Sequence, residues 1–214
     1  MINDESGGRI VEQQQNVKRS WALPITLVLL VFSSMGNILL YTKHIEHTRG
    51  NTVQTGESIF QGFKEGQEQL AHWSAYLEEV LSRAESEPSL ARLTAVHMAD
   101  GVAREHAGLA VLMEHAGMID SANLGQAADS YAAYEQKLEG TLRSVGTGSG
   151  GLTETERQSL GEVQSSFVKL TELLSAFHFG MEGDRNSMIR LTGGHDWIDI
   201  AEELHKELRE YTGA

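Results

Sequence analysis

Histidine is the residue in this sequence whose chemistry stands out most, because imidazole can bind a metal ion or transfer a proton. There are nine histidines. His44 and His47 lie one helical turn apart with Glu46 between them, and Glu202 with His205 forms a Glu-x-x-His unit. Di-iron helical bundles need two such units and two further carboxylates. We therefore expect no resident metal ion or other cofactor, and we expect the histidines to be hydrogen-bonded within a folded core.

Motifs of the common enzyme classes do not accompany these histidines. The sequence contains no cysteine, which excludes disulfides, thiolate nucleophiles, zinc–thiolate sites and iron–sulfur clusters. Residues 146–151 match the pattern G-x-G-x-x-G, but the dinucleotide fingerprint must follow a strand, and here a helical pattern precedes it. We interpret these glycines as a flexible linker and expect no catalytic residue.

The charge distribution argues against a nucleic-acid partner. The formal net charge is −13, and the first 41 residues carry three acidic and three basic side chains, so the whole excess lies in residues 42–214. Nucleic acids are bound by neutralising phosphates with lysine and arginine. An acidic domain would also be repelled by anionic lipid head groups, so we expect a solvated surface.

Residues 21–41 contain no charged side chain. As a helix this stretch would be about 31 Å long, which matches a bilayer core of about 30 Å. The run exceeds a signal-peptide core and no small-residue cleavage site follows it, so we predict a retained transmembrane helix in contact with membrane lipid. The anchor residues that we single out are Trp21, Pro24, Leu30, Phe32 and Tyr41.

Basic residues near this span predict its orientation. Lys18 and Arg19 directly precede it, whereas Lys43 and Arg49 follow it. The closest pair is expected on the cytoplasmic side, so residues 1–20 form a short cytoplasmic tail and residues 42–214 lie outside. The latter lack both cysteine and an N-x-S/T sequon, which favours a single-pass protein of a bacterial cell membrane.

Heptad spacing dominates the rest of the chain and predicts an all-α fold. Apolar residues step by three and four from Ile59 to Ala84 and from Leu160 to Met181. The predicted core residues are Phe63, Leu70, Trp73, Leu77, Tyr131, Leu138, Phe167, Leu170, Leu174 and Phe177. Six aromatic residues could instead line a ligand pocket between helices: Trp73, Tyr76, Tyr131, Tyr134, Phe167 and Phe177.

Helix start and stop signals lie between these runs. We expect a second helix at about Pro88–Ala116, and we expect it to lie in the centre of the bundle because it is rich in alanine. His97 and His115 would lie on one face of this helix, about 27 Å apart along its axis. Asp120 or Ser121 can cap the third helix and Asp196 the last one. Thr153 and Glu156 form a capping box for the fourth.

These boundaries predict a juxtamembrane stalk over residues 42–55 and, over residues 56–214, an extracytoplasmic antiparallel bundle. The bundle consists of four main helices and a short C-terminal helix.

Two binding functions fit these observations better than catalysis does. The first is a non-catalytic, membrane-anchored module that contacts another envelope protein or associates with itself. The alternative is a helical domain that senses a small ligand or a metal ion. In architecture alone the chain resembles the helical-bundle input domains of bacterial transmembrane receptors. Those cross the membrane again, and no second apolar span follows here, so sensing would require signalling through a partner.

Overall fold

The computed structural model describes residues 22–104 and 108–213, without the side chains of residues 22, 23, 47 and 49. Every element in these ranges is a helix. Residues 1–47 and 48–214 form two compact units. The prediction of an all-α chain with one apolar N-terminal helix is therefore confirmed.

The first unit contains the N-terminal part of α1 (Ala22–Arg83). An 18-residue window of this helix has a mean hydropathy of 1.8, and none of it is buried. Leu30, Phe32 and Tyr41 are each 68% exposed, Pro24 is exposed as well, and Trp21 lies outside the described residues. By length and composition this helix can cross a membrane, although an N-terminal signal sequence would meet the same criterion.

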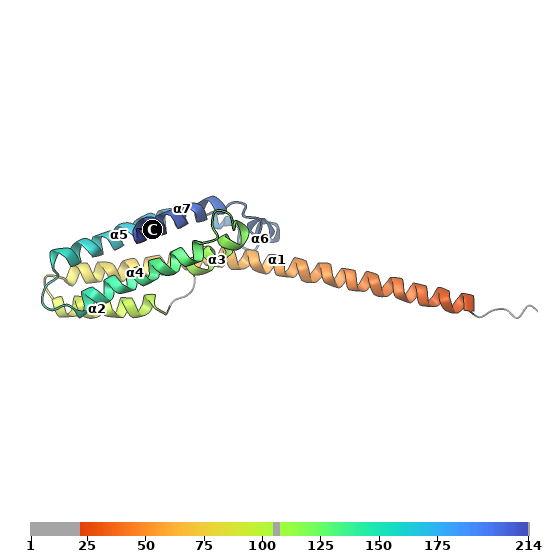
Figure 1. The fold of residues 1–214 in the computed structure, drawn as a ribbon, viewed down its shortest axis with the longest axis horizontal. Coiled ribbons are helices and arrows are strands. Elements are labelled where there is room, and N and C mark those ends of the chain that lie inside the picture. The colour runs from red at the N-terminus through yellow and green to blue at the C-terminus, as the bar shows by residue number, and fades with distance from the viewer. Residues whose placement is uncertain (1–21, 105–107, 214) are drawn as a thin grey trace, which may run out of the picture. The chain divides into compact units, whose positions relative to one another are not determined.

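The second unit is a helical bundle built from the remainder of α1 and the elements that follow it. These are α2 (Pro88–Val102), α3 (Leu109–Ile119), α4 (Ala127–Thr147), α5 (Glu154–Ser175), the 3-10 turn η1 (Phe179–Met181), α6 (Arg185–Leu191) and α7 (Ile198–Thr212). Figure 1 shows α2, α4, α5 and α7 running side by side, and α4 contacts α2, α3, α5 and α7. Residues 42–55 lie within α1, so the segment predicted as a stalk is helical.

All ten predicted core residues are buried, each with at most 3% of its surface exposed. Their rings meet across helices: Phe63 of α1 stacks on Phe177 at 3.9 Å between centroids, and its edge contacts Trp197 at 5.9 Å. Further along α1, Trp73 packs against Phe167 of α5 at 5.9 Å. These contacts join the apolar face of α1 to α5, to the segment after α5 and to the segment before α7. They also remove apolar surface from water, which stabilises the fold.

The predicted helix Pro88–Ala116 is wrong, because the structure has two helices there. The chain leaves α2 after Val102 and starts α3 at Leu109, after Gly108 at a φ of +61°. A Cβ on Gly108 would lie 2.7 Å from the backbone nitrogen of Gly66. The close approach to α1 and the left-handed φ both require glycine at this position, and the positive φ prevents a continuous helix from passing through it. α2 is also not central, since Leu93 on it is 64% exposed.

Two of the predicted caps are wrong and one is confirmed. Asp120 accepts from the backbone of Asn123, within the turn before α4, and α4 itself begins at Ala127. Asp196 pairs with Arg190 at 3.0 Å and does not cap α7, which begins after Trp197. The capping box of Thr153 and Glu156 is present as predicted at the start of α5.

Arg92 holds the glycine-rich connection between α4 and α5 in place. Its buried guanidinium donates to the carbonyl oxygens of Val145, Gly150 and Gly151, and it forms a two-fold hydrogen bond with Glu156 at 2.9 and 3.1 Å. The interpretation of residues 146–151 as a flexible linker is therefore corrected: the connection is tied to α2 by one arginine. The Arg92 hydrogen bonds also lower the pKa of Glu156 from about 4.5 to about 2.

This pKa predicts how the clamp responds to acid. Because the folded-state pKa of Glu156 is depressed, its stabilisation is fully present above about pH 4.5 and is lost as the pH falls towards 2. We expect Glu156→Gln to lower the free energy of unfolding at pH 7, and we expect its difference from the wild type to shrink between pH 4.5 and 2. Chemical denaturation at several pH values measures this difference. Glu154→Gln, in the same first turn of α5, is the control and should keep the wild-type acid dependence. If the difference in unfolding free energy between the wild type and Glu156→Gln stays constant down to pH 2, the lowered pKa of Glu156 is contradicted.

Candidate functional site

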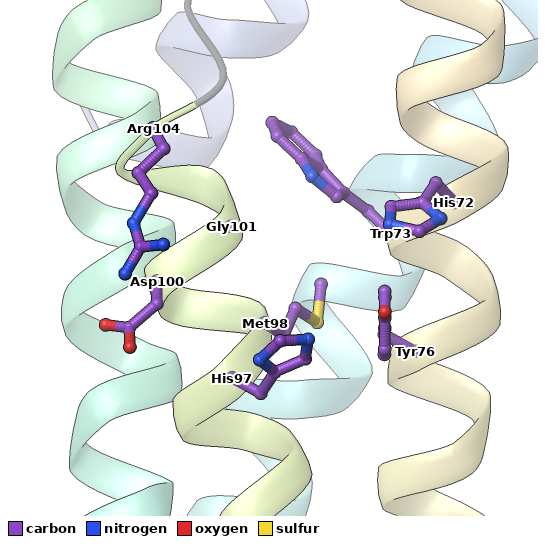
Figure 2. Close-up of a pocket in the computed structure, with 8 residues that line it drawn as sticks. All are labelled: His72, Trp73, Tyr76, His97, Met98, Asp100, Gly101 and Arg104. Carbon is purple, nitrogen blue, oxygen red and sulfur yellow. The ribbon is translucent and has the colours of Figure 1, made fainter.

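A pocket of about 270 Å³ lies between α1 and α2 in the second unit (Figure 2). It is lined by His72, Trp73 and Tyr76 from α1, by His97, Met98, Asp100 and Gly101 from α2, and by Arg104 from the turn that follows α2. On α1 the three residues fall within one turn, and on α2 the lining residues span about one turn as well, so both helices present one edge to the same space. The volume is just below the roughly 300–1,000 Å³ of typical small-molecule pockets.

The pocket has a buried floor and an exposed rim. Trp73 and Met98 form the floor, with 1% and 2% of their surface exposed, whereas His72, His97 and Arg104 at the rim are exposed. Figure 2 shows the indole of Trp73 reaching from α1 across the space towards α2. Gly101 contributes no side chain to this space, and a Cβ there would meet no atom within 4 Å.

The indole N–H of Trp73 has no hydrogen-bond acceptor within the described part of the chain, although the atom is buried. The other described tryptophan, Trp197, donates to the carbonyl oxygen of Leu191 at 2.8 Å. A buried donor without an acceptor costs roughly 1–3 kcal/mol, and such groups in folded proteins are rare. Trp73 thus presents an unused donor at the floor of a cavity.

The charged groups at the pocket are not equivalent. Asp100 accepts from Arg143 at 2.9 Å, and Arg143 also binds Glu139 at 2.7 Å. The hydrogen bonds that Arg143 donates to Glu139 and then to Asp100 raise the pKa of its guanidinium. The guanidinium of Arg104, in contrast, forms no ion pair with any residue that the structure describes. The charge of Asp100 is therefore balanced by Arg143, which does not line the pocket. The charge of Arg104 is not balanced by any described residue.

Three rings line the α1 side and the rim. Tyr76 lies between His72 and His97, with ring centroids 4.7 and 5.6 Å apart and interplanar angles of 88° and 71°. Edge-to-face contacts of this kind stabilise aromatic pairs by about 0.5–1.5 kcal/mol. They hold the two imidazoles in defined positions at the entrance.

Other histidines that the sequence singled out lie away from this pocket. His115 forms a hydrogen bond with Ser58, and His205 forms one with Ser130, both at 3.0 Å. Burial lowers the pKa of each imidazole. His97 and His115 belong to different helices, so the expected shared face does not exist. Among the described residues no group of three or more histidine, aspartate or glutamate side chains could hold a metal ion. The side chain of His47, which the sequence pairs with His44, lies outside the described part of the structure.

The sequence identified part of the pocket and missed the rest. Trp73 and Tyr76 were named as candidate pocket aromatics, whereas Tyr134, Phe167 and Phe177 are ordinary core residues. Tyr131 belongs to the same core and is 2% exposed. The contributions of His72, Met98, Asp100, Gly101 and Arg104 were missed, because they depend on which edge of α2 faces α1. The nearest signal was Gly101 within an alanine-rich helix.

Comparison with models of protein families, with curated proteins and with solved structures found no match to this chain.

Because the indole N–H of Trp73 has no acceptor among the described residues, we predict that replacing Trp73 and replacing Trp197 affect stability differently. Trp73 and Trp197 are equally buried and each contacts a phenylalanine ring at 5.9 Å. Trp197→Phe loses a hydrogen bond in addition to ring volume, so it should lower the free energy of unfolding by about 1 kcal/mol more than Trp73→Phe. Urea denaturation of the two variants measures this. A larger loss for Trp73→Phe would show that its N–H is bonded in the folded protein.

Proposed function

We propose that this protein is a membrane-anchored, non-catalytic domain that binds a small ligand in the pocket between α1 and α2. The observation that supports this function best is the unpartnered N–H of Trp73 at the floor of a cavity. Ligand sites are concave, largely apolar and equipped with a few polar groups that fix orientation. The buried floor of Trp73 and Met98, with polar groups at the rim, has these properties.

The remaining features of the proposal follow from the sequence. The apolar part of α1 would lie in the membrane of a bacterial cell, residues 1–20 in the cytoplasm and the bundle outside. Its support is the exposed apolar window of α1 together with Lys18 and Arg19 before it. A domain in this position would report a ligand outside the cell through a protein partner.

Contact with another envelope protein is the second candidate function, and one surface favours it. Leu90 and Leu93 of α2 are 37% and 64% exposed and lie one turn apart, on the same side of the helix. His97 follows Leu93 by four residues, so this surface borders the rim of the pocket. A partner that covers Leu93 would therefore also sense what the pocket contains.

Filling the pocket tests the ligand-binding proposal. Gly101→Leu places a side chain in the cavity, and neither Gly101 nor the exposed control position Gly161 of α5 has an atom within 4 Å of an added Cβ. We expect compounds from a small-molecule library that raise the melting temperature of the wild type to lose this effect in Gly101→Leu and to keep it in Gly161→Leu. A ligand at one hundred times its Kd stabilises the folded state by about 2.7 kcal/mol, which is measurable. If no compound distinguishes the two variants, the pocket proposal is contradicted and protein contact through α2 takes its place.

Protease access tests the orientation. With a tag after Ala214, protease added to intact bacterial cells should remove the tag, because the proposed orientation places the bundle outside. The tag should remain in the membrane fraction before digestion. A tag protected until the cells are lysed would reverse the orientation, and a released fragment beginning near Thr42 would show that the span is cleaved.

A further inference from the structure

We infer that the ligand of the α1–α2 pocket is a small carboxylate on a short apolar or aromatic body. This inference rests on the proposed ligand-binding function and specifies its chemistry. Three properties of the pocket lead to it. Among the described residues it has a donor without an acceptor and an arginine without a counter-ion, and it has apolar surfaces on the floor and one wall.

The first property requires a hydrogen-bond acceptor on the ligand. The N–H of Trp73 can only donate, and no described residue accepts from it. Met98 beside it offers a thioether, which is at best a weak acceptor. An oxygen atom of a bound ligand would therefore supply the interaction that the protein itself leaves open.

The second property selects a negative charge. Asp100 is bound by Arg143, which lies outside the pocket. Arg104 has no such partner among the described residues, so the pocket retains a positive guanidinium at its rim. The fork of an arginine matches the two oxygens of a carboxylate, and charge-assisted hydrogen bonds are about twice as strong as neutral ones. An arginine without an ion pair to any described residue is notable in a domain whose net charge is strongly negative.

The third property selects a ligand with an apolar body. Trp73 and Met98 present apolar surface at the floor, and the ring of Tyr76 forms part of the wall. The cavity of about 270 Å³ has room for one small molecule. An inorganic anion such as phosphate would use the donors and leave this apolar surface in contact with water, which is unfavourable.

The opposite charge is disfavoured by the same groups. Aromatic rings can bind a cation over their faces, and the pocket contains a tryptophan and a tyrosine. A cationic ligand, however, would lie near Arg104, would find Asp100 already paired, and would leave the N–H of Trp73 without an acceptor.

A matched series of probes tests the inference in the full chain, solubilised in detergent micelles. Benzoate, benzyl alcohol and benzylamine share one ring and differ in charge, and inorganic phosphate supplies an anion without an apolar body. The indole N–H resonances of the three tryptophans are recorded by ¹H–¹⁵N NMR, and Trp73→Phe assigns that of Trp73. We expect benzoate to move the Trp73 resonance downfield, as a new hydrogen bond does, and to leave the Trp197 resonance in place. Benzyl alcohol should bind at least tenfold more weakly, and benzylamine and phosphate should leave the Trp73 resonance unchanged.

Substitution of Arg104 tests the role of the charge. Arg104→Gln should weaken benzoate binding at least tenfold, or about 1.4 kcal/mol, and should leave benzyl alcohol binding unchanged. Arg104→Lys should restore part of the affinity. Arg185→Gln, at an exposed arginine of α6 outside the pocket, is the matched control and should bind benzoate as the wild type does. An unchanged Trp197 resonance in each variant shows that the bundle remains folded.

The outcomes separate this inference from the proposed function. Binding of benzyl alcohol or benzylamine as tight as that of benzoate, or benzoate binding that is insensitive to Arg104→Gln, would overturn the carboxylate and leave a ligand pocket in place. If phosphate moves the Trp73 indole resonance as far as benzoate does, the requirement for an apolar body is overturned and the site binds anions in general. No shift of Trp73 with any saturating probe would overturn the inference, whereas the comparison of Gly101→Leu with Gly161→Leu decides the proposed function independently.

Discussion

The burial of one face of α1 is the constraint on which the bundle depends. Residues from Ile59 to Ala84 present apolar side chains at every third or fourth position, and those at the seam are at most 3% exposed. Contacts from this face reach α3 through Gly66, α5 through Trp73 and the segment before α7 through Phe63. Since burying apolar surface is the main favourable term in folding, the remaining helices adopt the positions that cover this face.

The pocket is a place where this coverage is incomplete. Gly101 contributes no side chain, and α2 ends one residue later. The indole of Trp73 packs on Phe167, but its N–H has no acceptor among the described residues and lies at the pocket. Protein interiors are packed to a density that leaves few voids, so a cavity with an unused donor is an unusual feature of an otherwise well-filled bundle.

Electrostatics separate the arginines of the bundle into different roles. Arg92 is buried, and it ties α2 to the α4–α5 connection and to Glu156. Arg143, Arg157 and Arg190 form exposed pairs with acidic residues, and such pairs contribute little to stability. Arg104 differs from these because it lies at the pocket without an acidic partner in the described part of the chain. In a strongly acidic domain, this position gives the pocket a local charge opposite to that of the surface around it.

The sequence by itself determined the features that depend on nearby residues. Heptad spacing identified the helical class and the ten core residues, because periodicity reports which side of a helix is apolar. The capping box at Thr153 was also recognisable, since both partners lie within one turn. The apolar stretch of α1 required only length and composition.

Tertiary structure decided the features that join distant segments. Gly108, at the start of α3, meets Gly66 of α1 at a positive φ, so no continuous helix passes through it. Arg92 reaches carbonyl groups more than fifty positions away in the sequence. The pocket likewise combines residues of α1 with residues of α2 and the turn after it. A helical pattern shows which side of each helix is buried, but not which neighbouring helix covers that side. The contact between Gly108 and Gly66, the hydrogen bonds of Arg92 and the pocket all depend on which helices are neighbours.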